Sequence, residues 1–116
     1  MPAGSHDFEI EQGATLLKTV TWKDDNGTPI NLTGCTARLQ ARSSTSSPTV
    51  LIDLTTENGG IVITPLTGTL TLNMTATQTA ALAFKRAKYD LEVVDVAGFV
   101  TRLLQGSISV SPEVTK

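Results

Sequence analysis

The sequence contains a single cysteine, Cys35, and a single histidine, His6, among its 116 residues. With one cysteine no disulfide can form within the chain, which excludes a small secreted domain held together by disulfides. A zinc site built from cysteine and histidine lacks its ligands, and a histidine in a mobile N-terminal segment is not a positioned catalytic base. Stability must therefore come from packing, and neither a metal nor an organic cofactor is expected.

Charge and long apolar runs are also scarce. Nine basic residues stand against eleven acidic ones, for a net charge of −2, so the basic surface that binds nucleic acid or anionic membrane is missing. No run is long enough to cross a bilayer, and the N-terminus lacks the apolar core of a signal peptide. The length predicts one domain, residues 8–112, between a flexible leader, residues 1–7, and a C-terminal tail, residues 113–116.

Strict alternation of apolar and polar residues is what the sequence has in abundance. Residues 35–42 and 69–74 show it clearly, and such a period of two is typical of strands with one buried face. Turn sequences rich in asparagine and glycine, at residues 25–27 and 58–60, separate the runs. The alanine-rich segment 75–84 breaks this rhythm and predicts a short helix between two strands.

Three residues are expected to have structural roles. Tyr89 begins an alternating strand directly after the predicted helix, where immunoglobulin-type sandwiches often place a tyrosine whose hydroxyl bonds back to the crossover backbone. Trp22 is expected in the core, and Cys35 is expected to be a buried, unreactive thiol on the apolar face of its strand. The fold predicted is an all-β, immunoglobulin-like antiparallel β-sandwich of about eight or nine strands, with one short helix near residues 75–84.

The acidic residues of segment 89–95 are the best candidates for chemistry. Asp90 and Glu92 lie two apart on one strand, so their side chains share a face, and paired carboxylates can hydrolyse glycosides. However, the apolar residues between them define the core face, which places both acids in solvent. A hairpin at residues 96–98 would bring Arg102 opposite them as a weak cross-strand ion pair. The chain is therefore predicted not to be an enzyme.

An apolar stripe is predicted on the face opposite the core. The alternation in their strands places three apolar side chains on the solvent-facing side: Val94, Val100 and Leu104. Together they would form an interface for a homo-oligomer. The alternative is that a second layer, such as the helix at 75–84, covers them.

Several short sequence segments, taken in this order, resemble those of a known group of proteins. They are Gln12-Gly13, Asn31-Leu32-Thr33-Gly34, Tyr89-Asp90-Leu91-Glu92 and the segment from Gly98 to Gly106. The chain resembles small tail-associated structural proteins of tailed bacteriophages and prophages, similar in plan to the immunoglobulin-like N-terminal domain of upper baseplate proteins. The resemblance implies a non-catalytic virion protein of the tail or baseplate. It would be made in the bacterial host cytoplasm and would assemble with itself and with other phage virion proteins.

The sequence is also compatible with two other functions. The same small sandwich could be a capsid decoration or head-completion protein that clamps capsomers. A carbohydrate-binding module is the third hypothesis, although such modules usually stack sugars on exposed aromatic rings, and the few aromatic residues here mostly occupy positions expected in the core.

Overall fold

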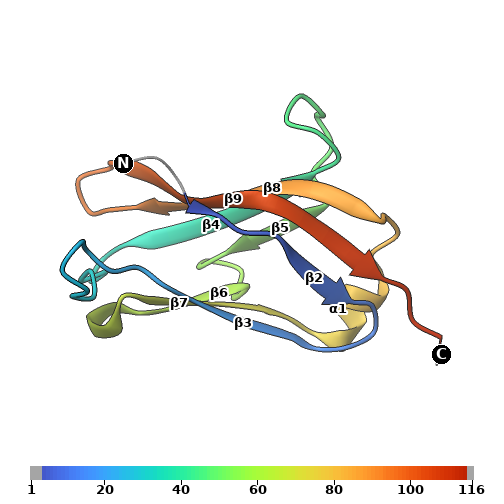
Figure 1. Cartoon of the computed structure of the whole chain (residues 1–116), viewed down its shortest axis with the longest axis horizontal. Coiled ribbons are helices and arrows are strands. Elements are labelled where there is room, and N and C mark those ends of the chain that lie inside the picture. Colours follow the sequence, from blue (N-terminus) through green and yellow to red (C-terminus); the bar gives the residue numbers. More distant parts are fainter. Residues whose placement is uncertain (1–3, 115–116) are drawn as a thin grey trace.

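The computed structural model describes residues 4–114, which form two β-sheets packed face to face (Figure 1). Within this range there are nine strands, one α-helix and one 3₁₀ helix. In chain order they are β1 Gly4–Ser5, β2 Phe8–Glu11, β3 Leu16–Thr21, β4 Thr36–Arg42, β5 Ile52–Thr55, β6 Ile61–Thr64, η1 Pro65–Thr67, β7 Thr69–Met74, α1 Ala76–Ala80, β8 Arg86–Val94 and β9 Val100–Ser111. The predicted all-β sandwich is confirmed, and its short helix lies inside the predicted segment.

The larger sheet has the order β5–β4–β8–β9, and both β1 and β2 pair with the outer edge of β9. These two short strands run parallel to β9, whereas every other pairing is antiparallel. The smaller sheet has the order β3–β7–β6. Helix α1 connects β7 in the smaller sheet to β8 in the larger one, at the end of the molecule that holds the C-terminus (Figure 1).

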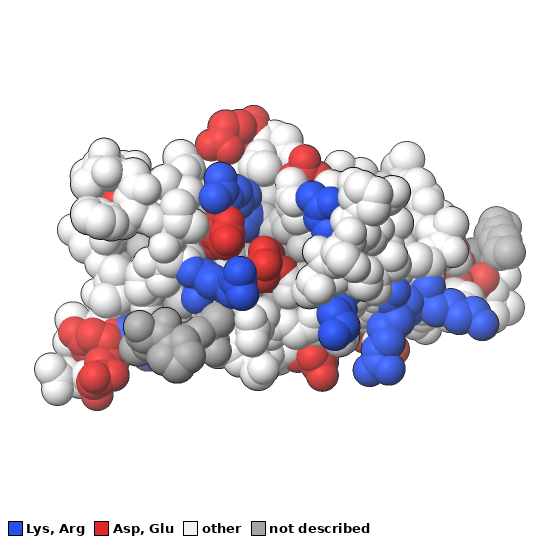
Figure 2. All heavy atoms as spheres, turned by 90° about the horizontal axis from the view of Figure 1, so that it is seen from above, with Lys and Arg blue, Asp and Glu red and all other residues white. Residues whose placement is uncertain are grey.

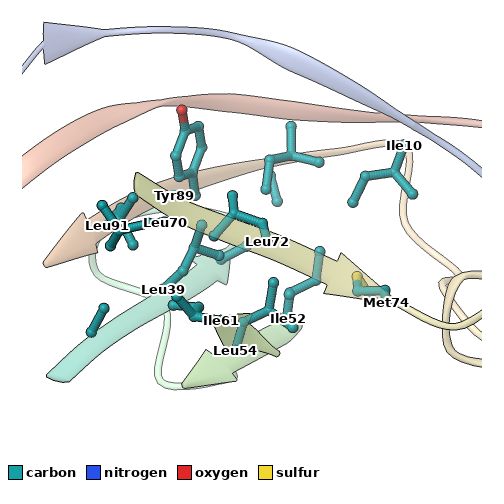
Figure 3. Close-up of a cluster of buried hydrophobic side chains, with 14 of the residues drawn as sticks. Ile10, Leu39, Ile52, Leu54, Ile61, Leu70, Leu72, Met74, Tyr89 and Leu91 are labelled. Atoms are coloured by element: carbon teal, nitrogen blue, oxygen red, sulfur yellow. The ribbon is translucent and has the colours of Figure 1, made fainter. Parts of the chain in front are cut away.

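The core lies between the sheets and consists of the inward residues of the alternating strands. Figure 3 shows Leu39 and Leu91 of the larger sheet close to Leu70 and Leu72 of the smaller one, and all four are at most 1% exposed. Burying one such side chain stabilises the fold by about 1.5–3 kcal/mol. Alternation is what selects this packing, because a one-residue slip of any strand would turn these residues to solvent.

Helix α1 is short but well anchored. Thr75 caps it, and the side chain of Gln78 completes a capping box by accepting a hydrogen bond from the Thr75 backbone. Thr79 is fully buried; its hydroxyl accepts from the Gly13 N–H at 3.0 Å and donates to the Ala14 carbonyl at 2.8 Å. These two bonds fix the helix against the turn between β2 and β3.

Residues 4–7 correct the prediction of a flexible leader over residues 1–7. Gly4–Ser5 forms β1, and the His6 N–H donates to the Gln105 carbonyl at 2.9 Å. The open edge of β9 offers unpaired backbone groups that this segment can satisfy. Gly106 lets the segment come close, because a Cβ at this position would collide with the His6 carbonyl oxygen.

The two ends of the chain are described only in part. Residues 1–3 of the predicted leader and residues 115–116 of the predicted tail lie outside the described residues. Within the tail, the Glu113 N–H donates to Oε1 of Gln12 at 3.0 Å. The sandwich therefore holds the chain from residue 4 at one end, and residue 113 remains in contact with it at the other.

Tyr89 has a different partner from the one that the sequence predicted. The residue is 5% exposed, and its hydroxyl donates to the carbonyl of His6 at 2.5 Å, not to the crossover backbone. Tyr89 lies directly opposite Gly106 in the sheet, so its side chain reaches across a residue without a side chain to the N-terminal segment. Phe8 packs edge-on against the ring, with 5.2 Å between ring centroids. The tyrosine thus fastens the first strands to the sandwich.

Candidate functional site

The predicted acidic pair lies on the outer face of the larger sheet, with basic partners on both sides. Oδ2 of Asp90 is 3.6 Å from Nε of Arg102, which confirms the predicted cross-strand ion pair. Oε1 of Glu92 is 2.8 Å from Nε of Arg38. This second pair could not be predicted from the sequence, because it depends on the register between β4 and β8. Such exposed pairs contribute about 0–1 kcal/mol each and mainly favour the correct register.

The predicted stripe of three apolar residues is not present. Val94 and Val100 are paired on the outer face, but Leu104 lies opposite Leu91, whose side chain is fully buried. A register shift opposite Leu91 and Glu92 inserts one extra residue into β9, and such a bulge reverses the faces that follow it. Leu104 therefore packs against the core. Helix α1, the alternative cover, lies at the other end of the molecule from the β8–β9 turn (Figure 1).

An exposed apolar surface does exist next to Val94 and Val100, at the β8–β9 turn. Val96 is 81% exposed, Phe99 73% and Val100 51%. We call Val94, Val96, Phe99 and Val100 the hairpin surface. The turn is held by hydrogen bonds, because Oδ1 of Asp95 accepts from the N–H groups of residues 97 and 99, at 2.9 and 3.0 Å. The alternation of residues did not reveal this surface, because Val96 and Phe99 lie in the turn, outside both strands.

Trp22 and Cys35 occupy positions at the margin of the core. Both side chains are half-buried and pack against the buried cluster. The backbone of Trp22 bonds to Gly68 and to Ile30, joining the β3–β4 connection to the smaller sheet. Burial raises the pKa of the Cys35 thiol, and the nearby Asp95 carboxylate adds to this effect. A raised pKa keeps the thiol protonated at neutral pH, which is the less reactive form.

A polar hollow of about 490 Å³ lies on the outer face of the larger sheet. Strands β4, β8 and β9 contribute residues to it, as do the loop after β4 and strand β1. Its lining consists of Ser5, Gln40, Arg42, Ser44, Thr45, Lys88, Tyr89, Asp90, Arg102, Gln105, Gly106 and Ser107. Figure 2, which views the molecule from above, shows basic and acidic side chains gathered around a depression on this side.

Among residues 4–114, no three histidine, cysteine, aspartate or glutamate side chains are grouped closely enough to hold a metal ion. No helix in the same range is long and apolar enough to span a membrane.

The arrangement of two sheets, with parallel pairing of the first strands onto the last, defines an immunoglobulin-like β-sandwich. No family model matches the sequence, and no curated protein matches it either. Among solved structures, the chain is similar to one titled "crystal structure of chicken TCR for 2.0", with 15% sequence identity and a TM-score of 0.55. The match covers 97% of this chain and 55% of that one, so this chain spans about half its length. At this identity the likeness concerns the fold alone.

Proposed function

We propose that this chain is a structural protein of a tailed bacteriophage or prophage virion, located in the tail or baseplate. It acts by self-assembly and by docking to neighbouring virion proteins, without catalysis. The order of sequence motifs from Gln12-Gly13 to Gly106 supports the phage assignment, and an immunoglobulin-like sandwich is compatible with it. The observation that supports assembly is the hairpin surface.

The hairpin surface has the properties of a contact site. Three of its large apolar side chains lie within five consecutive residues and are more than half exposed. Covering such surface gains about 25 cal/mol per Å² of apolar area. The Asp95 hydrogen bonds hold the turn in place before any contact forms, which lowers the entropy lost on association. In immunoglobulin-like sandwiches, loops at the ends of the sheets are the usual sites of recognition.

The strand edges are weaker docking sites than the hairpin surface. Strand β3 is at an edge of the smaller sheet, but its Lys18 points toward the other sheet, with Nζ 5.2 Å from the centroid of the Phe8 ring. An inward-pointing charge on an edge strand discourages pairing with another chain. Edge strands β5 and β6 have only four residues each, and short edges have the same effect.

The assembly proposal is tested by the mass of the protein in solution. We expect the wild-type chain to exceed its 12.3 kDa monomer mass in light scattering. The double variant Val96→Ser/Phe99→Ser should return to the monomer mass with its fold intact. Leu17→Ser is the matched control, because Leu17 is as exposed as Phe99, at 73%, but lies on β3. A wild-type monomer, or a variant mass equal to an oligomeric wild type, would exclude the hairpin surface.

The location in the particle needs a separate measurement. Mass spectrometry of purified particles, with tails separated from heads, should find the chain in the tail fraction. Its recovery in the head fraction alone would replace the tail or baseplate assignment with a capsid role.

A further inference from the structure

We propose that the polar hollow binds an acidic saccharide, that is, a sugar residue carrying both a carboxylate and neighbouring hydroxyl groups. This inference concerns the outer face of the larger sheet, not the hairpin surface, and it does not rest on the virion proposal. It follows from the charge, the fixed geometry and the polar chemistry of the lining.

The charge of the hollow is opposite to that of the chain. Arg42, Lys88 and Arg102 line it against a single carboxylate, Asp90, whereas the whole chain has a net charge of −2. Arg102 is paired with Asp90, but within residues 4–114 neither Arg42 nor Lys88 takes part in a salt bridge. Three cations and one carboxylate give the lining a net positive charge, which attracts ligands of negative charge. The ligand must therefore carry negative charge.

Arg42 is held in position before any ligand binds. Its Nη1 donates to the carbonyl of Ser47 at 2.8 Å, and its Nη2 donates to Oε1 of Gln40 at 3.0 Å. A guanidinium has five N–H groups, so about three remain for other acceptors. A fixed guanidinium suits a planar carboxylate, because the two can form parallel hydrogen bonds. Lys88 adds a second, more mobile positive charge to the same lining.

The remaining lining indicates a sugar rather than a bare anion. The Asp90 carboxylate, which Arg102 neutralises in part, repels phosphate more strongly than a singly charged carboxylate, and it can accept hydrogen bonds from hydroxyl groups. Amide and hydroxyl side chains surround it, and these both donate and accept. They are Ser5, Gln40, Ser44, Thr45, Gln105 and Ser107. A volume of about 490 Å³ is typical of small-molecule sites. Recognition here uses polar groups instead of the stacked aromatic rings that are usual in carbohydrate-binding modules.

The binding experiment is a titration of the ¹⁵N-labelled protein, followed by NMR, with four probes. They are a trimer of galacturonic acid, neutral maltotriose, inorganic phosphate and a hexapeptide of alternating aspartate and glycine. We expect the galacturonate trimer to shift amide signals of β4, β8 and β9. Its affinity should be at least tenfold higher than that of any other probe. No shifts with the trimer, or equal or tighter binding of phosphate, peptide or maltotriose, would overturn the proposal.

Variants separate the hollow from the rest of the charged face. Arg42→Gln and Lys88→Gln should each weaken trimer binding at least tenfold. Asp90→Asn should weaken the trimer but strengthen phosphate. Arg38→Gln is the matched control, since Arg38 lies on β4 and pairs with Glu92 outside the lining. Trimer affinity unchanged by both Arg42→Gln and Lys88→Gln would refute the site. Light scattering of these variants keeps this result distinct from a failure of assembly.

Discussion

Replacing Tyr89 with phenylalanine removes one oxygen atom from the junction between the N-terminal strands and the sandwich. The Tyr89 hydroxyl donates to the His6 carbonyl at 2.5 Å, and the residue is 5% exposed. Phenylalanine keeps the ring and its edge-on contact with Phe8, so packing is preserved. The change in stability of this variant therefore reports the contribution of the hydrogen bond and not that of the buried ring.

The expected loss of stability depends on whether water can replace the hydroxyl as the partner of the His6 carbonyl. A typical buried hydrogen bond contributes about 1 kcal/mol to stability, and a buried acceptor left without any hydrogen-bond partner costs up to about 3 kcal/mol. The segment of residues 4–7 is at the surface, so water can reach the freed carbonyl, and the lower figure applies. We expect the free energy of unfolding of Tyr89→Phe to fall by about 1 kcal/mol, which is about 4 °C in Tm for a chain of this length.

The assay is a double-mutant cycle in urea denaturation, with deletion of residues 1–7 as the second change. In the truncated chain the acceptor is gone, so Tyr89→Phe should then have an effect close to zero. Amide exchange should locate the change, because the His6 N–H donates to Gln105 and should exchange faster in the single variant. Equal effects of Tyr89→Phe in the full and truncated chains, with unaltered exchange at His6, would refute the proposed fastening.

Two further predictions concern the same junction. Burial, followed by the charge of Asp7, raises the pKa of Tyr89 from 10.0 to about 12. The folded state therefore favours the neutral phenol. The free energy of unfolding of the wild type should decline from about pH 10 to pH 12. Urea midpoints across this range should show a smaller decline in Tyr89→Phe, and parallel curves would contradict the assignment. Gly106→Ala should displace the His6 carbonyl and destabilise the fold by about 1–3 kcal/mol; because it disrupts the same bond, its effect and that of Tyr89→Phe should not add in thermal melts.

The sandwich itself could be predicted because its strongest signals are local. Strands such as β4 and β7 bury one face each, so their alternation is visible in a single stretch of sequence. Helix α1 has its own start signal in Thr75 and lies where the alternation stops. Such patterns require no knowledge of which strand pairs with which.

The N-terminal pairing and the polar hollow could not be predicted in this way. Gly4–Ser5 is too short and too polar to show a period, and its pairing depends on the open edge of β9 and on Gly106, about a hundred residues later. The hollow likewise joins β4, β8 and β9, whose alignment depends on register across the sheet. Each basic residue in it looks like an ordinary solvent-facing side chain when its strand is considered alone.

The face of Leu104 was predicted wrongly for another reason, which the burial at the two ends of β9 reveals. Counting in steps of two from Ile108, which is fully buried, places residue 104 on the core side. Counting in steps of two from Val100, which is exposed and paired with Val94, places residue 104 on the solvent side. The two counts conflict, so β9 must contain an extra residue between Val100 and Leu104. That residue allows β9 to bury its second half while its first half keeps Val100 exposed beside the turn. The bulge therefore ends the exposed apolar surface of β9 next to the β8–β9 turn.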